Sequence, residues 1–278
     1  YAGVTIGTFV GGTTGSDLVI TLNSSADVTA ASALVKAITY ENTDTDNPTA
    51  GDRTVRYVLS DGDGESSANY DTTVSINALN DAPVLASIEG TPLNYTENDG
   101  NVVITSTVSF TDVDDSNIES AVVQITSAYT SGEDVLAFTN QSGINGIYNA
   151  VDGSLNLSGS ATLAQYQAAI RSITYSNTSE NPDTSTRTVS FTINDGDVDS
   201  NTQTRDIAIT AVNDAPVATG NTVTTNEDVP LIIGPSNFSF TDMENDSLAS
   251  VTITGLTLNG GTLTHSAGAV TVTNGMEV

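Results

Sequence analysis

The strongest constraint on the fold is that the sequence repeats itself with a period near 133 residues. The block Asn-Asp-Ala-Pro-Val begins at Asn80 and begins again at Asn213. The residues around these blocks, 38–84 and 173–217, match along their length. Self-similarity at a fixed period indicates an array of like structural units rather than one globular domain.

A second matched pair, 95–115 and 225–246, follows each Asn-Asp-Ala-Pro-Val block. Together the matches predict the C-terminal part of a repeat at 1–81, a complete repeat at 82–214 and the N-terminal part of the next at 215–278. We expect neither partial repeat to close a β-sandwich alone, because each would leave strand edges open. Neighbouring chain of the same polymer, or another copy of the chain, would complete them.

Within the complete repeat the apolar residues alternate with polar ones. Val189, Phe191 and Ile193 occupy every second position, and so do Ile207 and Ile209. This period of two is typical of half-buried antiparallel strands, and these five side chains are predicted to face inward. Asp-Gly and Asn-Gly turn signals separate the strand candidates.

One segment departs from the strand pattern. In residues 162–172, Leu163, Tyr166 and Ile170 recur at helical spacing, which predicts a short helix. The predicted fold class is therefore all-β, with tandem Greek-key β-sandwiches of the cadherin-like or immunoglobulin-like kind, each carrying one short helix. The sandwiches are expected to follow one another as a rod.

The composition excludes several functions. The chain has 34 acidic residues, 6 basic residues and a formal charge of −28, so it does not suit binding to a nucleic-acid backbone. It contains no Cys and only one His, which disfavours thiolate chemistry and a zinc site. No run of 18 apolar residues occurs, so no membrane insertion is expected. We predict that the chain is not an enzyme.

The acidic residues cluster beside the repeat boundaries. Carboxylates, Asn side chains and backbone carbonyls are the ligands that Ca²⁺ takes, six to eight at a time. Few basic residues are available to neutralise these clusters, so a bound cation is the favoured explanation. The alternative is that acidic turns only keep a protein with a thin core in solution. The predicted metal ligands are Asn80, Asp81, Glu97, Asp112, Asp114, Asp195, Asp197, Asn213, Asp214, Asp242 and Asp246.

The segments that end in Asn-Asp-Ala-Pro-Val, with an Asp-Gly-Asp turn upstream, resemble the cadherin-like tandem repeats of giant bacterial surface adhesins. These are the extender repeats of RTX-type adhesins, and the stretch 163–197 also resembles the related proteoglycan-type repeats. The resemblance implies a calcium-stiffened sandwich of seven strands, an extracellular location at the cell surface and no catalysis.

The resemblance also implies how the ligands divide between two junctions. The first junction would gather Asn80, Asp81, Asp112, Asp114 and Asp195, with Asp197 as a further candidate. The second would gather Glu97, Asn213, Asp214, Asp242 and Asp246. The acidic motif that usually adds ligands has no counterpart in Ser158–Gln165, so one or two ions are expected at a junction.

Two functions follow as predictions. In the first, the chain is a structural extender or fibre-forming repeat of a large extracellular adhesin, and its partners are neighbouring repeats or other copies in a fibre. In the second, it is a calcium-dependent binding module for a cell-surface polysaccharide or for another copy of itself. The sequences at the ends of the predicted strands are nearly the same in both matched regions. This favours the structural function, because a dedicated ligand site need not recur in every repeat.

Overall fold

The computed structural model describes residues 1–13, 15–234, 237–247, 249–253, 257, 259, 261–265, 270–271 and 276–277. It divides into two compact units, Tyr1–Leu79 (unit 1) and Asn80–Val278 (unit 2). The boundary predicted after residue 214 does not separate compact units and stays a prediction. Neither of the two helices described is long and apolar enough to cross a membrane.

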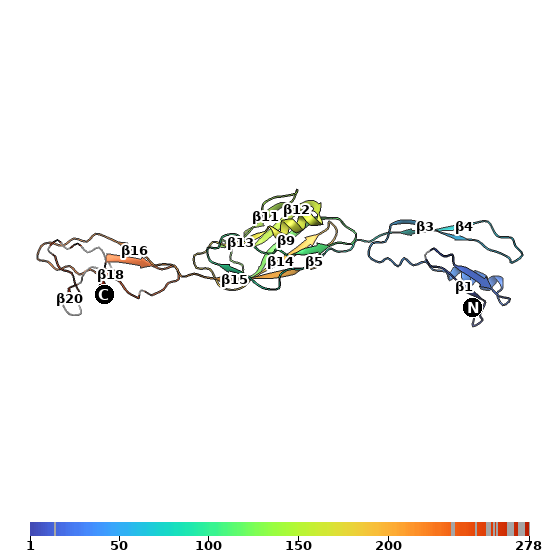
Figure 1. Ribbon diagram of the computed structural model, residues 1–278, viewed down its shortest axis with the longest axis horizontal. Coiled ribbons are helices and arrows are strands. Elements are labelled where there is room, and N and C mark those ends of the chain that lie inside the picture. The colour runs from blue at the N-terminus through green and yellow to red at the C-terminus, as the bar shows by residue number, and fades with distance from the viewer. Residues whose placement is uncertain are drawn as a thin grey trace. The chain divides into compact units, whose positions relative to one another are not determined.

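Unit 1 contains two separate β-hairpins and one helix (Figure 1). The first hairpin pairs β1 with β2 and the second pairs β3 with β4, all antiparallel. Asp27 caps the helix, because its carboxylate accepts a hydrogen bond of 2.7 Å from the Ala30 amide. The elements are β1 (Gly7–Val10), β2 (Val19–Leu22), α1 (Val28–Lys36), β3 (Gly51–Tyr57) and β4 (Tyr70–Ile76).

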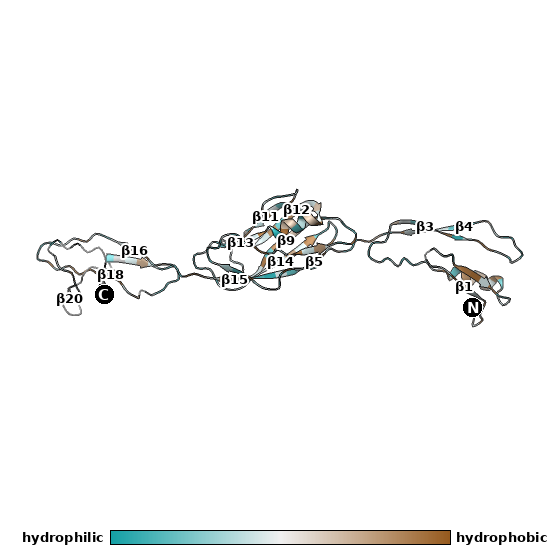
Figure 2. Ribbon diagram, in the orientation of Figure 1, coloured by the Kyte–Doolittle hydropathy of each residue, from teal (hydrophilic) through white to brown (hydrophobic). Residues whose placement is uncertain are grey.

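The apolar residues of unit 1 are largely open to solvent. Ala30 is the one buried hydrophobic residue among those described in this unit. Phe9 is 73% exposed and Leu59 is 63% exposed. Figure 2 shows apolar residues on the β1–β2 hairpin. Unit 1 therefore has no closed core in the part of the chain described.

Unit 2 begins with the predicted complete sandwich. Its first strands are β5 (Val84–Ala86), β6 (Leu93–Thr96), β7 (Val102–Val103), β8 (Ser109–Thr111), β9 (Asn117–Ser127) and β10 (Asp134–Ala137). The remaining elements are β11 (Asn145–Asn149), β12 (Ser154–Thr162), α2 (Leu163–Arg171), β13 (Thr174–Asn177), β14 (Arg187–Asn194) and β15 (Gln203–Thr210).

The rest of unit 2 consists of short strand pairs. Strand β16 pairs with β17, β18 with β21, and β19 with β20, all antiparallel. Their bounds are β16 (Val217–Gly220), β17 (Phe238–Thr241), β18 (Thr252–Ile253), β19 (Thr264–His265), β20 (Val270–Thr271) and β21 (Met276–Glu277). The β16–β17 pair repeats the β5–β8 pair, in keeping with the sequence match.

The sandwich contains a six-stranded sheet in the order β11-β12-β9-β14-β15-β6 and a three-stranded sheet in the order β10-β13-β7. Strand β9, eleven residues long, lies between β12 and β14, which are not its neighbours in sequence. This non-sequential order is of the Greek-key type. The last pair, β15 and β6, is parallel.

One hydrophobic core joins both sheets and α2. The five side chains predicted to face inward are all buried, with Val189, Phe191, Ile193 and Ile207 fully so and Ile209 7% exposed. The predicted all-β sandwich is thus confirmed. Burying each large apolar side chain contributes about 1.5–3 kcal/mol, so a core of aliphatic and aromatic side chains holds this repeat together.

The predicted short helix is confirmed as α2. Thr162 begins it with a capping box, since the Thr162 hydroxyl accepts from the Gln165 amide and the Gln165 side chain accepts from the Thr162 amide. Tyr166 and Ile170 are fully buried on its inner face. The helix therefore covers the core that the strands alone leave open.

A buried ion pair lies at the end of the sandwich where β10, β13 and β14 meet. Arg187 Nε is 3.2 Å from an oxygen of Asp134, and both side chains are fully buried. The Asp134 carboxylate also accepts hydrogen bonds from the Tyr175 hydroxyl and the Asn177 side-chain amide. The Arg187 guanidinium donates to the backbone carbonyl of Asp183, so the network fixes the loop between β13 and β14.

We predict that Asp134→Ala lowers the free energy of unfolding of unit 2 by roughly 3–5 kcal/mol, because it leaves the Arg187 charge buried without its partner. Chemical denaturation followed by circular dichroism measures this loss. Asp183→Ala is the matched control, since the Asp183 carboxylate is 65% exposed and 3.9 Å from the same guanidinium. Equal losses in the two variants would contradict the prediction.

Candidate metal site

The parallel pairing of β6 with β15 sets up the main acidic site. Both strands end together, with Thr210 opposite Thr96. Glu97 follows β6 directly, and its amide donates to the Thr210 carbonyl at 2.9 Å. Its carboxylate then accepts from the Val212 amide at 2.8 Å. Glu97 is thereby held beside the Asn213–Asp214 linker.

Three carboxylates converge at this point. Oxygens of Glu97, Glu180 and Asp214 lie within 4.8 Å of one another, close enough to hold a single metal ion. Glu97 is 95% buried, and its Oε1 has no hydrogen-bond partner among the described residues. A buried anionic oxygen without a partner is costly, so it calls for a cation or a donor.

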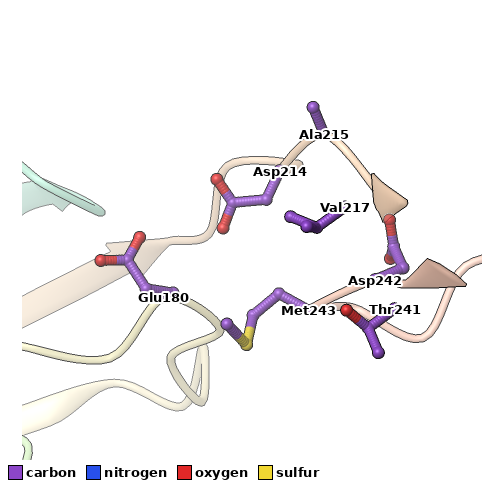
Figure 3. A pocket seen from close by; sticks show the side chains of 7 residues that line it. All are labelled: Glu180, Asp214, Ala215, Val217, Thr241, Asp242 and Met243. Carbon is purple, nitrogen blue, oxygen red and sulfur yellow. The ribbon is translucent and has the colours of Figure 1, made fainter. Parts of the chain in front are cut away.

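Glu180 reaches the site from the loop that the buried ion pair supports. The Asn98 side-chain amide donates to Glu180 Oε2 at 3.2 Å. Figure 3 shows Glu180 and Asp214 at the rim of a pocket, with the Met243 side chain below them in this view. This pocket has a volume of about 310 Å³, and none of the described residues that line it is basic. Its lining consists of Glu180, Asp214, Ala215, Val217, Thr241, Asp242 and Met243.

The negative charges in this site oppose one another. Burial raises the pKa of Asp214 above its ordinary value, and the nearby carboxylates of Glu244, Glu180, Glu97 and Asp242 raise it further. A raised pKa means that the folded chain favours the protonated acid. In the absence of a cation, stability is therefore lost as pH rises past the ordinary Asp range and the carboxyl ionises.

Glu244 forms the edge of the site. Its Oε2 accepts from the Asp214 amide at 3.2 Å, and its Oε1 is buried without a hydrogen-bond partner among the described residues. The neighbouring Asp242 accepts from the Asp246 amide through Oδ1. The loop 242–246 thus closes on the linker through Glu244.

The same construction occurs at the start of unit 2. The Asp81 amide donates to the Asp114 carboxylate at 3.2 Å, as the Asp214 amide donates to Glu244. The Asn80 side chain donates to Asp195 Oδ2 at 2.9 Å. The two Asn-Asp linkers of the chain therefore meet their acidic loops with the same hydrogen bond.

This first cluster is also crowded with like charge. The pKa of Asp115 is raised by burial and by the charges of Asp112, Asp114, Asp195 and Glu119. Oxygens of Asp112 and Glu119 are buried without hydrogen-bond partners in the described structure. The pKa of Asp195 is lowered in spite of burial, because it accepts hydrogen bonds from the Asn80 side chain and from two backbone amides.

The structure brings most of the predicted ligands together in two groups. The first group holds five of the six residues assigned to the first junction, and Asp197 is exposed, its amide donating to Asp195. In the second group, Glu97 and Asp214 join the triad and Asp242 lines the pocket. The Asn213 side-chain amide donates to the Asp214 backbone carbonyl, and Asp246 is exposed.

Two residues of the second site are absent from the predicted ligands. Glu244 has a signal in the sequence, because it aligns with Asp114 in the matched segments 95–115 and 225–246. Glu180 also has a signal in the sequence, because an acid followed by Asn-Pro occurs at Asp46 and again at Glu180 in the matched segments 38–84 and 173–217. It places a third carboxylate oxygen beside those of Glu97 and Asp214.

Part of the chain is similar to a known protein. The chain is 33% identical over 125 residues to halomucin from Haloquadratum walsbyi (strain DSM 16790 / HBSQ001). The match covers 43% of this chain and 1% of halomucin, so the chain spans a very small part of a very large protein. No family model matches the chain. Its assignment to cadherin-like repeats accordingly stays a prediction.

We predict that Glu180→Gln raises the melting temperature of unit 2 by a few degrees in the presence of a chelator. The substitution removes one of three converging charges, and Gln can still accept from Asn98. Thermal melting by circular dichroism measures the shift. Asp183→Asn in the same loop is the control, since its carboxylate lies outside the triad. A lower melting temperature for Glu180→Gln alone would show that the triad is not under repulsion.

Proposed function

We propose that the chain is a calcium-binding structural repeat of a large extracellular protein and that the ion stiffens the link after the sandwich. The observation that carries the proposal is the triad Glu97, Glu180 and Asp214, with its buried oxygen that lacks a partner. The proposal assigns the chain no catalysis.

The donor set suits calcium better than other common cations. Each member of the triad offers carboxylate oxygen, and oxygen is what hard cations take. Zinc prefers nitrogen and sulfur, but the sequence has one His and no Cys. Magnesium demands near-ideal octahedral geometry, whereas calcium accepts irregular shells completed by carbonyls and water. The junction is built from surface loops, so it suits the irregular shell that calcium accepts better than the octahedral shell that magnesium demands.

An ion in the triad would tie two parts of unit 2 together. Glu97 and Glu180 belong to loops of the sandwich, while Asp214 belongs to the linker that leads to β16. The Asn181 side chain adds a hydrogen bond of 3.1 Å to the Met243 carbonyl across the same link. Neutralising the carboxylates would remove their repulsion and fix the linker angle, because contacts between neighbouring domains are otherwise small.

The extracellular setting follows from the same chemistry. Extracellular calcium modules bind with dissociation constants on the order of 10⁻⁴–10⁻³ M, which suits the millimolar calcium outside cells. Such sites would stay largely empty inside a cell. Similarity to part of halomucin, a very large protein with the name of a mucin, supports a place at a cell surface. Recurrence of the linker hydrogen bond in both clusters supports a repeated structural role.

Calcium titration of the full chain tests the proposal, with melting of unit 2 as the readout. At a calcium concentration of 100 dissociation constants, binding adds about 2.7 kcal/mol to the stability of the folded state. We expect the melting temperature to rise by on the order of 10 °C, and Glu97→Gln to abolish most of this rise. Small-angle scattering of the same samples should show a narrower distribution of chain dimensions with calcium than with chelator.

Glu227→Gln is the matched control for Glu97→Gln. Glu227 occupies the same place in the repeated sequence but is exposed, so its substitution should leave the calcium response intact. The proposal is wrong if calcium changes neither melting nor scattering of the unaltered chain. It is also wrong if both substitutions weaken the response equally, since that would indicate diffuse screening of charge.

A further inference from the structure

An arginine holds the backbone of the preceding loop in both units of the chain, a contact called the arginine clamp below. Arg187 donates through Nη1 to the backbone carbonyls of Asp183 and Ser185, at 2.5 and 2.6 Å. Arg53 of unit 1 stands at the same place in the repeated sequence. It donates to the carbonyls four and two residues before it, at 2.5 and 3.3 Å. The acceptors of Arg187 are likewise four and two residues before it, so the two clamps are alike.

The arginine clamp is separate from the buried ion pair of unit 2. Arg187 uses Nε for the carboxylate of Asp134 and Nη1 for the two carbonyls. Arg53 makes its clamp although it forms no ion pair among the residues that the structure describes. What the two repeats share is therefore the hold on the loop and not the neutralisation of a buried charge.

The clamped loop carries an acid in both repeats. An acid followed by Asn-Pro lies ahead of the arginine at the same distance in each, Asp46 in the first and Glu180 in the second. In unit 2 the loop is also anchored at its other end, because the Thr178 amide donates to the Glu133 carbonyl at 3.0 Å. Pro182 between these anchors is buried, and its ring restricts the backbone. The loop thus presents Glu180 on a short, fixed segment.

Glu180 needs such support because its neighbours in the triad repel it. Its oxygens lie within 4.8 Å of those of Glu97 and Asp214, and all three groups are carboxylates. The hydrogen bond that Glu180 accepts from the Asn98 side chain is exposed to solvent, whereas the Arg187 side chain is fully buried. Hydrogen bonds are stronger in the protein interior than in water, so the buried clamp is the firmer restraint on the loop.

We propose that Arg187 is a positioning residue of the metal site, whose clamp holds Glu180 within reach of Glu97 and Asp214 before an ion is present. This inference rests on the proposed function, since it concerns the same triad. Ordering the loop in advance lowers the cost of binding, which would otherwise include closing the loop against the repulsion of like charges. Outer-shell partners of metal ligands raise affinity in this way.

Calorimetric titration of calcium into the full chain tests the inference through a double-mutant cycle of Arg187→Lys and Glu180→Gln. Lysine keeps the positive charge beside Asp134 but lacks the planar fork that reaches Asp134 and both carbonyls at once. We expect Arg187→Lys to weaken calcium binding by about tenfold, as loss of an outer-shell partner does. In a chain that already carries Glu180→Gln, the same change should have little further effect.

Amide hydrogen exchange gives a second readout that needs no metal. In the presence of a chelator, exchange within residues 178–186 should be faster in Arg187→Lys than in the unaltered chain, because the loop has lost its restraint. If Arg187→Lys does not fold, Pro182→Ala takes its place in both measurements, since it loosens the loop without altering the arginine.

Arg171→Lys is the matched control. Arg171 also donates to backbone carbonyls, those of Thr107 and Val108, but the loop that it holds carries no member of the triad. Its substitution should leave both the calcium affinity and the exchange of residues 178–186 unchanged, whatever its effect on the melting temperature.

The possible results separate this inference from the proposed function. No calcium binding by the unaltered chain would refute the proposed function and, with it, this inference. Calcium binding that Arg187→Lys leaves unchanged would refute the inference alone. An equal loss of affinity with and without Glu180→Gln would also refute it, since the arginine would then act through the general stability of the sandwich. Unchanged exchange in residues 178–186 would show that the clamp does not order the loop.

Discussion

The parallel pairing of β6 with β15 is the interaction on which the candidate site depends. It ends both strands at the same edge of the sandwich, where Glu97 meets the linker. Without that pairing, Glu97 and Asp214 would have no reason to approach, since 117 positions separate them in the chain. The buried pair of Asp134 and Arg187 then holds the loop that adds Glu180. A few backbone contacts in the sandwich thus gather carboxylates that repel each other.

The few basic residues of the chain are not available to relieve that repulsion. In unit 2, Arg187 is buried against Asp134, and Arg205 pairs with Glu89 at 3.3 Å. Arg171 donates to the backbone carbonyl of Val108. Each arginine of this unit therefore serves the fold away from the acidic site. Under the proposed function, a cation from solution would neutralise the site and let a chain of net charge −28 keep several carboxylates at one link.

Much of the fold was predictable from the sequence. The alternation of apolar and polar residues can be read from neighbouring positions, and the repeats can be read by comparing segments of the chain. The alternation of Val189, Phe191 and Ile193 fixes which face of β14 is buried, and the spacing around Tyr166 fixes the helix. The order of strands in the sheet was harder to predict from the sequence. Insertion of β9 between β12 and β14 depends on contacts between residues far apart in the sequence.

The repeated blocks made part of the candidate site predictable from the sequence, and the rest depends on tertiary contacts. Asp81 and Asp214 are conspicuous because each follows an Asn in a repeated block, and the structure gives both the same hydrogen bond. Glu180 lies in a loop whose position depends on the fold of a complete sandwich. An acid followed by Asn-Pro recurs at Asp46 and Glu180, but the sequence alone does not show that Glu180 comes close to Glu97. That approach depends on tertiary contacts.

A crystal structure grown with calcium, or with a lanthanide located by its anomalous scattering, tests the central claim most directly. The account predicts an ion among Glu97, Glu180 and Asp214, with carboxylate oxygens 2.3–2.6 Å from calcium. Glu97 Oε1, which has no hydrogen-bond partner in the described structure, should be one of its ligands. An empty triad at saturating calcium, with ions bound only at exposed acids elsewhere, would contradict the account.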